Sequence, residues 1–253
     1  MNMLSKIKRR ISGGTPNRMA EMALTDADIP EAAAALGMSP LRRLFFDRHR
    51  QGGRLVHKWI QFLDAYDTHF SRYRGTDVTM LEIGVSMGGS LEMWRDYFGQ
   101  KATICGIDVN PDCANRVSSP NKVRIGSQDD PDFLHGVIGE IGQPDIILDD
   151  GSHIGRHQTA SFHILFPLLK EGGLYVIEDL HTSYWSGSWE GGYRKAGTGI
   201  ELVKQMIDDM HAWYHDRPDE TQAMQWVPAI HLYDSIVFIE KRRRMMPRHV
   251  KVQ

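Results

Sequence analysis

Residues 78–91 read VTMLEIGVSMGGSL, an apolar run followed at once by a glycine-rich turn and the start of an amphipathic segment. The short apolar run predicts a buried strand, and residues 90–98 (SLEMWRDYF) predict the helix that follows it. Further strand candidates lie at 103–109, 122–127, 145–150 and 174–179, with helical patterns at 133–141 and 157–170 between them. Strands that alternate with helices predict an α/β fold, with a parallel sheet covered by helices on both faces.

The two ends of the chain depart from this alternation. Residues 229–241 (AIHLYDSIVFIEK) hold two apolar runs with a gap only at Asp234 and Ser235, too short for a crossover helix, so we expect an antiparallel hairpin. Residues 31–38 (EAAAALGM) and 56–73 (VHKWIQFLDAYDTHFSRY) look helical. In the second of these, one buried stripe is expected from Trp59, Phe62, Leu63, Tyr66 and Phe70.

Length and composition fit one globular domain. The chain has 253 residues, of which 41% are hydrophobic and 25% charged, and its formal net charge is -2. Residues 1–18 and 241–253 carry eleven basic side chains and no acidic one, which leaves a formal charge of -13 for residues 19–240. The acidic body argues against a nucleic-acid binder, and the basic ends read more simply as solvated tails than as contacts to nucleic acid or lipid.

The two cysteines, Cys105 and Cys113, are too few for a disulfide framework and predict a reducing cytoplasm. The first residues are basic but lack an apolar run of signal-peptide length, and no stretch has the length of a membrane span. We therefore expect a cytoplasmic protein with no membrane span.

The glycine-rich turn differs from a dinucleotide fingerprint. Gly84, Ser86 and Gly89 occupy the three places of G-x-G-x-x-G, so the middle glycine, where backbone approaches a pyrophosphate, is missing. Glu82 is unfavourable beside phosphate but suits an ammonium, and Asp108 at the end of the second strand is placed to hold ribose hydroxyls. A cofactor with a ribose, a cationic amino-acid part and no phosphate is S-adenosylmethionine. The alternative is a tight strand-to-helix turn without a ligand.

The loop after the third strand, GSQDD at 126–130, offers Gln128 and Asp129 to an adenine edge. Its simpler interpretation is a polar loop with a helix N-cap. Asp149, at the end of the fourth strand, is expected to contact the cofactor or the backbone.

Two acidic motifs, DDGSH at 149–153 and EDLHTSYW at 178–185, follow the fourth and fifth strands. Because adjacent strands lie about 4.8 Å apart, Asp150, Glu178 and Asp179 can converge on one ion. An all-oxygen set suits Mg²⁺, Mn²⁺ or Ca²⁺ rather than structural zinc. Glu178 and Asp179 can share that ion only if the chain has already left the strand.

His153 lies three residues after Asp150, within reach of a metal-bound substrate. A Lewis acid that lowers the pKa of an alcohol and an imidazole that takes its proton make a sensible pair. A lone histidine is more often a surface or core residue, but its place beside a ligand candidate favours the catalytic role. His181 is the rival base, and His157 more simply begins the next helix.

These motifs together resemble the metal-dependent sugar O-methyltransferases of the macrolide-glycoside (mycinamicin and macrocin) type. The resemblance covers roughly residues 57–240 and rests on HKWIQFLDAYDTHF, LEIGVSMGGSLEMW, GIDVNP, DDGSH and YVIEDL. It implies a Rossmann-like class I methyltransferase sheet of seven strands, mostly parallel with the last strand antiparallel. Its motifs imply Mg²⁺ on Asp150, Glu178 and Asp179, and His153 as general base. The implied S-adenosylmethionine pocket is lined by Tyr66, Glu82, Gly84, Ser90, Asp108, Gln128 and Asp129.

We expect three parts: an N-terminal arm or lid at 1–55, partly helical, the methyltransferase domain at 56–241, and a basic tail at 242–253. The arm and the loop after the fifth strand should form the acceptor pocket, with His181, Tyr184 and Trp185 as substrate contacts and Trp189 and Tyr193 beside them. The alternative for these aromatic side chains is ordinary packing under a long loop. We expect no separate N-terminal domain like that of the larger antibiotic enzymes, so their oligomeric arrangement and acceptor are not carried over.

The expected function is transfer of a methyl group from S-adenosylmethionine, with Mg²⁺ or Mn²⁺, to a sugar hydroxyl of a glycosylated natural product or glycan. The expected partners are a small-molecule glycoside and a second copy of the chain in a homo-oligomer. Two other functions remain open at this point: a catechol or phenol O-methyltransferase, and a noncatalytic S-adenosylmethionine-binding subunit. A nucleic-acid methyltransferase is disfavoured because an acidic active face repels phosphate.

Overall fold

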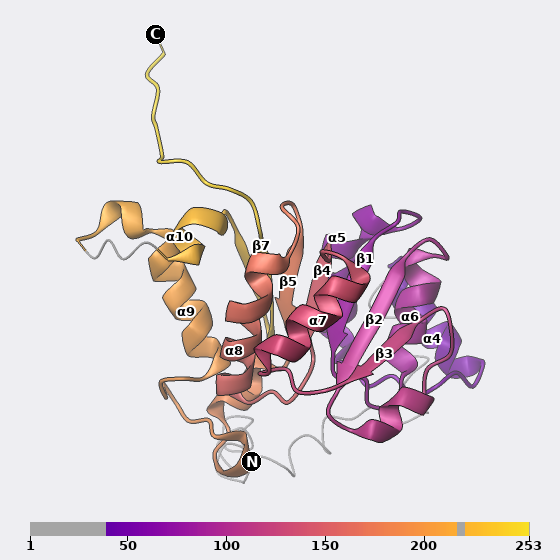
Figure 1. Cartoon of the computed structure of the whole chain (residues 1–253). Coiled ribbons are helices and arrows are strands. Elements are labelled where there is room, and N and C mark those ends of the chain that lie inside the picture. The colour runs from indigo at the N-terminus through magenta and orange to yellow at the C-terminus, as the bar shows by residue number, and fades with distance from the viewer. Residues whose placement is uncertain (1–38, 217–220, 253) are drawn as a thin grey trace, which may run out of the picture. The chain divides into compact units, whose positions relative to one another are not determined.

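The computed structural model describes residues 39–216 and 221–252. Most of the predicted arm, including the helical pattern at 31–38, lies outside the described residues. The strands are β1 (Thr79–Ile83), β2 (Thr103–Asp108), β3 (Lys122–Ile125), β4 (Ile146–Asp149), β5 (Leu174–Ile177), β6 (Ile230–Tyr233) and β7 (Ile236–Glu240). They form one sheet in the order β3-β2-β1-β4-β5-β7-β6, in which only β7 runs antiparallel to its neighbours (Figure 1). This confirms the predicted sheet and its terminal hairpin.

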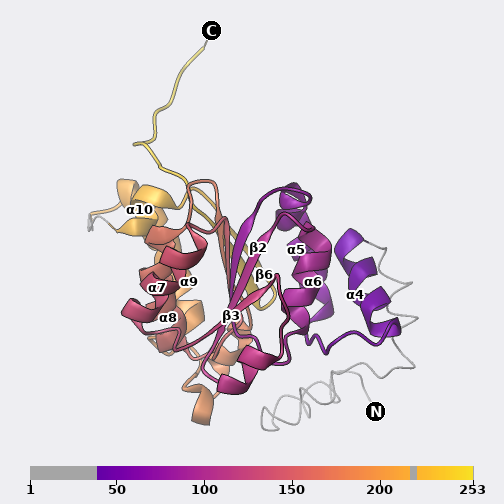
Figure 2. The same cartoon turned by 45° about the vertical axis from the view of Figure 1, so that its right-hand side comes forward.

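Helices cover both faces of the sheet. The α-helices are α4 (Pro40–Arg50), α5 (Ile60–Phe70), α6 (Gly89–Phe98), α7 (Pro131–Ile141), α8 (Gly155–Leu165), α9 (Gly199–Met210) and α10 (Gln222–Trp226). The 3-10 helices are η1 (Ser71–Tyr73), η2 (Pro111–Asn115), η3 (Phe166–Leu168), η4 (Leu180–Tyr184), η5 (Gly187–Trp189) and η6 (Ala212–Tyr214). Figure 2 shows α4, α5 and α6 on one face, with α7, α8 and α9 on the other.

The strands supply both hydrophobic layers because successive side chains point to opposite faces. In β7, for example, Ile236 and Phe238 pack with α5 and α6, whereas Val237 and Ile239 pack with the opposite layer. The first layer is rich in aromatic rings. Its buried aromatic residues are Phe62, Tyr66, Phe70, Trp94, Tyr97, Phe98 and Phe238. The second layer is mainly aliphatic, so the sheet separates two cores of different character.

The predicted helix at 56–73 begins later than the pattern indicates. α5 starts at Ile60, and its N-cap Trp59 has extended backbone with φ -65° and ψ 135°. The helical prediction for residues 56–59 was therefore wrong, although four of the five stripe residues are buried as expected. The exception is Trp59, which is half-buried and whose indole donates a hydrogen bond to Asp179. Long-range contacts at the carboxyl ends of the strands thus override the helical pattern at residues 56–59.

Two segments flanking the expected methyltransferase domain also take part in packing. Leu41 and Phe46 of α4 are buried, within the arm expected at 1–55. At the other end, the backbone N–H groups of Arg242 and Arg244 donate to carbonyls of Trp226 and Gln225. The boundaries at residues 55 and 241 stay predictions.

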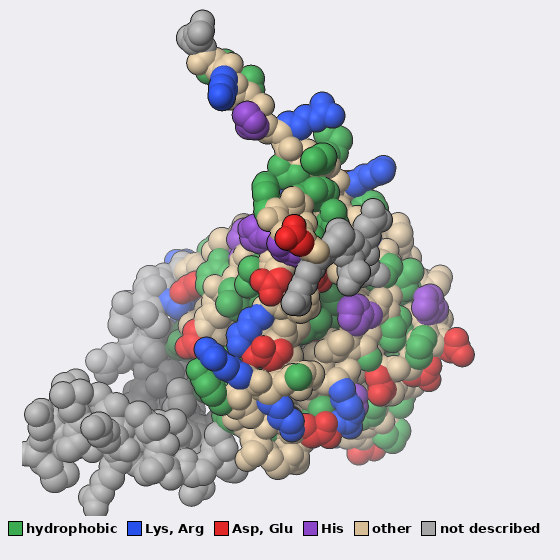
Figure 3. Space-filling model, turned by 90° about the vertical axis from the view of Figure 1, so that its left-hand side faces the viewer, with side chains coloured by type: hydrophobic (Ala, Val, Ile, Leu, Met, Phe, Trp, Pro, Cys, Tyr) green, Lys and Arg blue, Asp and Glu red, His purple; other side chains and the backbone are tan. Residues whose placement is uncertain are grey.

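Beyond Arg244 the chain projects from the body of the described unit with basic and histidine side chains along it (Figure 3). Met245 and Val250 are more than four-fifths exposed there. None of the described helices has both the length and the apolar character needed to cross a bilayer.

Candidate functional site

The glycine-rich turn lies at the carboxyl end of β1, between two other segments. Gly84 has φ +96°, and a Cβ at this position would overlap the carbonyl oxygen of Asp150. A Cβ on Gly89, the first residue of α6, would overlap the carbonyl oxygen of Leu55. Glycine is therefore required at both positions, because it lets the chain at Asp150 and at Leu55 approach the turn closely.

A cavity of about 300 Å³ opens at this edge of the sheet. It is lined by residues 55–59 and by residues 84–87, 89 and 90. The acidic residues Asp108, Asp150, Glu178 and Asp179 line it as well, together with His153. A second cavity of about 230 Å³ is lined by Gln128 and His157 and shares Gly84, Asp108 and Gly151 with the first. The two cavities therefore adjoin along the carboxyl ends of β1, β2 and β4, where open α/β sheets bind ligands.

Glu82 and Asp108 have carboxylates of different character: Asp108 lines both cavities, whereas Glu82 lines neither. Glu82 is fully buried: Ser90 donates a hydrogen bond of 3.0 Å to its Oε2, while its Oε1 has no hydrogen-bond partner among the described residues. Burial raises the pKa of Glu82 to about 7, against the opposing effects of Lys58 and Ser90. Burial alone would raise the pKa of Asp108, but the backbone N–H groups of Asn110, Ser86 and Val85 hold it below its ordinary value.

Three further residues predicted for the cofactor site, Gln128, Asp149 and Asp129, interact with other side chains of the protein. Gln128 lines the second cavity, and its side-chain amide donates to both carboxylate oxygens of Asp149 at 3.1 and 3.2 Å. Asp149 is fully buried, and burial raises its pKa. It thus acts on the cavity through Gln128 rather than by lining it. Asp129 accepts from Ser127 and lies 3.7 Å from His157.

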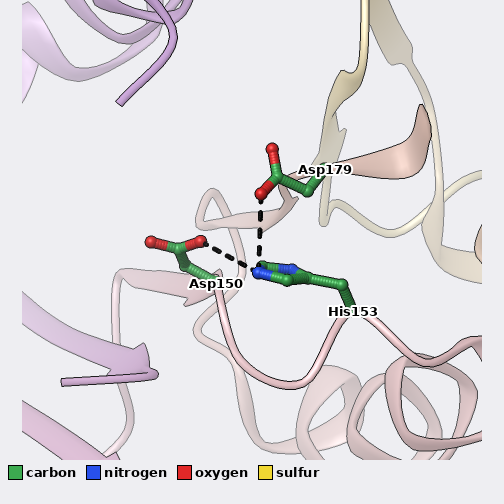
Figure 4. Close-up of side chains that lie close together, drawn as sticks. All are labelled: Asp150, His153 and Asp179. Atoms are coloured by element: carbon green, nitrogen blue, oxygen red, sulfur yellow. Dashed lines mark ion pairs between the residues drawn. The ribbon is translucent and has the colours of Figure 1, made fainter. Parts of the chain in front are cut away.

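Asp150, His153 and Asp179 converge at the ends of β4 and β5 (Figure 4). His153 Nε2 is 3.4 Å from Asp179 Oδ2 and 3.8 Å from Asp150 Oδ1. Asp179 and His153 both have φ +56°, so each stands in a left-handed turn beyond its strand. The condition stated for Glu178 and Asp179 is met, since β5 ends at Ile177. Two carboxylates and one imidazole within 4.8 Å can hold a divalent cation.

Glu178 lies apart from this group and faces a buried lysine. Lys58 Nζ is 2.6 Å from Glu178 Oε1, 2.5 Å from Asp150 Oδ2 and 3.8 Å from Glu82 Oε1. The hydroxyl of Tyr66 also donates to Glu178 Oε1, so Tyr66 touches the acidic residues and does not line either cavity. Burial alone would lower the pKa of Lys58, but the carboxylates of Asp150, Glu178 and Glu82 raise it above its ordinary value. Three carboxylates within 3.8 Å of its nitrogen thus favour the protonated ammonium of Lys58.

Lys58 and Trp59 were missed from the sequence. They lie in the HKW motif, which reads as the start of an amphipathic helix but forms an extended segment over the site. Lys58 is nevertheless the single lysine between Lys8 and Lys101, a stretch whose other strong bases are all arginine. That bias was the available signal for a specific role.

A chain of ring contacts leads from the imidazole of His153 to that of His181. The Trp189 ring lies 6.3 Å from that of His153, Trp185 lies 5.5 Å from Trp189, and His181 lies 4.6 Å from Trp185, all measured between ring centroids. His181 Nδ1 hydrogen-bonds to Ser235 and lies 3.8 Å from Asp179. By contrast, Tyr184 and Tyr193 are exposed and make no ring contact with this group.

Known proteins are similar to this chain in both sequence and fold. It is 38% identical over 206 residues to demethylmacrocin O-methyltransferase of Streptomyces fradiae, covering 74% of this chain and 51% of that protein. It is 37% identical over 200 residues to mycinamicin VI 2''-O-methyltransferase of Micromonospora griseorubida, covering 72% and 48%. The chain therefore spans about half the length of the curated relatives it matches. No family model matches the sequence.

The structural comparison gives the same result. The MycE methyltransferase of the mycinamycin biosynthetic pathway, solved with Mg, SAH and mycinamycin VI, superimposes with a TM-score of 0.71 at 34% identity, covering 81% of this chain and 54% of that one. The chain has the class I methyltransferase fold and resembles the macrolide-sugar O-methyltransferases. In this methyltransferase fold, the two cavities and the acidic residues lie together at the carboxyl ends of the parallel strands.

Proposed function

We propose that this chain is an S-adenosylmethionine- and Mg²⁺-dependent O-methyltransferase that acts on a sugar hydroxyl of a glycosylated natural product or glycan. The observation that carries this proposal is the convergence of Asp150, His153 and Asp179 beside the glycine-rich cavity. The similarity to sugar O-methyltransferases of macrolide and tetracenomycin compounds supports it.

S-adenosylmethionine fits the residues that surround the two cavities. Glu82 Oε1 is a buried acceptor without a hydrogen-bond donor and would suit the ammonium of the cofactor, although Glu82 lines neither cavity. Asp108 lines both cavities and would bind the ribose hydroxyls. Gly84 and Ser90 line the first cavity, and Gln128, which lines the second, would meet the adenine. When bound, the cofactor supplies an electrophilic methyl group on a sulfonium.

A hard divalent cation fits the acidic residues. Asp150, Glu178 and Asp179 would hold it, because Asp150 and Asp179 already converge with His153, and Glu178 shares the Lys58 ammonium with Asp150. Mg²⁺ or Mn²⁺ would supply a Lewis acid that lowers the pKa of the acceptor hydroxyl.

His153 is the proposed general base, and it accepts the hydroxyl proton at Nε2. This atom faces the carboxylates of Asp150 and Asp179, which stabilise the imidazolium that forms. Thr182 donates a hydrogen bond of 2.9 Å to the His153 carbonyl and holds the loop in place. Trp185, Trp189 and His181 would form the wall for the acceptor sugar, since a flat apolar surface suits the C–H face of a ring. Exposed Tyr184 stays a weaker prediction for this wall.

The experiment is a methyl-transfer assay by mass spectrometry with S-adenosylmethionine and Mg²⁺ over a panel of acceptors. The panel compares macrolide and tetracenomycin glycosides with their aglycones and with catechols. Methylation of glycosides alone supports the proposal, whereas methylation of catechols favours the phenol alternative. Full activity after exhaustive chelation would remove the metal from the mechanism, and cofactor binding without turnover on any acceptor would favour a noncatalytic subunit.

We further propose a cytoplasmic location, because Cys105 and Cys113 are both buried free thiols. A homo-oligomer also remains a proposal, which sedimentation of the purified chain would test.

A further inference from the structure

Lys58 places one ammonium among the four carboxylates that we call the acidic cluster: Glu82, Asp150, Glu178 and Asp179. The Lys58 side chain is 1% exposed and lies within 2.6 Å of oxygens of both Asp150 and Glu178. Glu82 and Glu178 are themselves 0% and 2% exposed. Such buried carboxylates need a nearby positive charge, because an unpaired buried charge is strongly unfavourable.

The extended segment before α5 delivers that charge. The backbone carbonyls of Arg54 and Leu55 pack against Gly89, and the Trp59 indole donates a hydrogen bond of 3.1 Å to Asp179. Lys58, between these two anchors, is thereby directed into the cluster. Its position is set by the chain on both sides rather than by the ion pairs alone.

Two of the carboxylates that Lys58 contacts, Asp150 and Glu178, are also proposed ligands of the divalent cation. We propose that Lys58 is a resident counter-cation, which holds the acidic cluster together without metal and weakens its affinity for a divalent cation. This inference rests on the proposed metal dependence. The sign follows from electrostatics: whether the ion displaces the ammonium or binds beside it, a positive charge at this distance opposes it.

The decisive variant is Lys58→Met, which keeps the length and apolar stem of the side chain and removes its charge. Titration with Mn²⁺ followed by electron paramagnetic resonance should give a dissociation constant about tenfold lower, or lower still, than in the wild type. Lys204→Met is the matched control, because Lys204 is an exposed lysine on α9 that pairs with Glu201. Its Mn²⁺ affinity should equal that of the wild type.

Thermal unfolding gives a second readout that needs no turnover. In chelator, Lys58→Met should unfold at a lower temperature than the wild type, because the carboxylates lose their counter-cation. Mg²⁺ should raise its unfolding temperature by more than it raises that of the wild type, since a tighter-binding ligand stabilises the folded state more. If Lys58→Met alone does not fold, the double variant with Glu82→Gln removes one buried anion as well and leaves the proposed metal ligands intact. Its Mn²⁺ affinity should still exceed that of the wild type.

The outcomes separate this inference from the proposed function. If the wild type binds Mn²⁺ and the folded variant binds it equally or more weakly, Lys58 does not oppose the metal, and the inference fails while the metal site stands. If neither protein binds Mn²⁺, both the inference and the proposed metal dependence are overturned.

Discussion

The acidic cluster and a cluster of aromatic rings both contact α5 and share one residue, Tyr66. Ion pairs hold the first cluster together, and apolar packing holds the second. The acidic cluster has buried charges around Lys58, whereas an aromatic cluster behind it packs Tyr66 against Phe70 and Trp94 with ring centroids 5.3 and 5.1 Å apart. Phe98 and Phe238 complete the aromatic cluster. Tyr66 belongs to both, because its ring packs with the aromatic residues and its hydroxyl donates to Glu178.

The two clusters contribute differently to stability and to chemistry. Burial of aromatic surface stabilises the fold without any ligand. Buried ion pairs add little net stability, because the cost of removing charges from water offsets their attraction. We therefore expect substitutions in the aromatic cluster to change mainly the free energy of unfolding. Substitutions around the acidic cluster should change binding and turnover as well, because removing one partner leaves another buried charge or polar group unpaired.

The largest effect should follow from His153→Ala. Loss of the proposed base should lower kcat about 10²- to 10⁴-fold. Its affinity for S-adenosylhomocysteine, measured by calorimetry, should change little. His163→Ala is the control, because His163 is exposed on α8, the helix that follows the His153 loop. If His153→Ala kept the kcat of the wild type, His153 would not be the general base.

Next in size is Phe70→Ala in the aromatic cluster. It should lower the free energy of unfolding by about 3–5 kcal/mol, measured by urea denaturation, because it leaves a cavity among buried rings. Leu232→Ala on β6 should change it by less than about 0.5 kcal/mol, since Leu232 is half exposed. A loss in Phe70→Ala as small as that control would show that the aromatic cluster is not the source of stability.

Tyr66→Phe tests the shared residue. The ring packing is kept, but Glu178 loses a donor, so we expect a loss of about 1–3 kcal/mol in the free energy of unfolding. Tyr97→Phe is the matched control, because its hydroxyl donates at 2.7 Å to Asp67, which is only half-buried. Equal losses of unfolding free energy in the two variants would show that the hydrogen bond from Tyr66 to the buried Glu178 stabilises the fold no more than the hydrogen bond from Tyr97 to Asp67.

The smallest expected effect concerns pH and His69, at the far end of α5. Its imidazole stacks on Phe238 and lies beside His231, and burial first and His231 second lower its pKa from 6.5 to about 4. The unfolded chain then binds a proton below about pH 6.5 that the folded chain does not, so His69 reduces stability as the pH falls from 6.5 to 4. The unfolding free energy of His69→Gln should fall less steeply over this range, and identical slopes would contradict the shift.

Much of the sheet was predictable because its parallel strands are buried on both faces. β1, β4 and β5 are buried at every position and so appear as short, mainly apolar runs, in which Thr79, Glu82 and Asp149 are the polar or acidic residues. The acidic residues after β4 and β5 could be placed together for the same reason, since the ends of adjacent parallel strands meet at one edge.

Lys58 could not be placed in this way. Its partners Asp150 and Glu178 lie 92 and 120 residues further along the chain, and the local pattern around it favours a helix. The left-handed backbone of Asp179 and His153 could not be predicted either, because the local sequence gives no signal for this conformation at non-glycine residues. Asp179 and His153 are two of the described non-glycine residues with left-handed backbone, and both lie at the proposed metal site.

The position of β7 within the sheet has a consequence for synthesis in the cell. This strand lies between β5 and β6 and supplies side chains to both hydrophobic layers. Neither layer is therefore complete until the ribosome has released residues 236–240. Polypeptides that end before Ile236 would expose the uncovered edge of β5 and apolar surface on both faces of the sheet. Chaperones and proteases should recognise such products, so premature termination late in this chain is expected to remove the protein rather than leave a shortened enzyme.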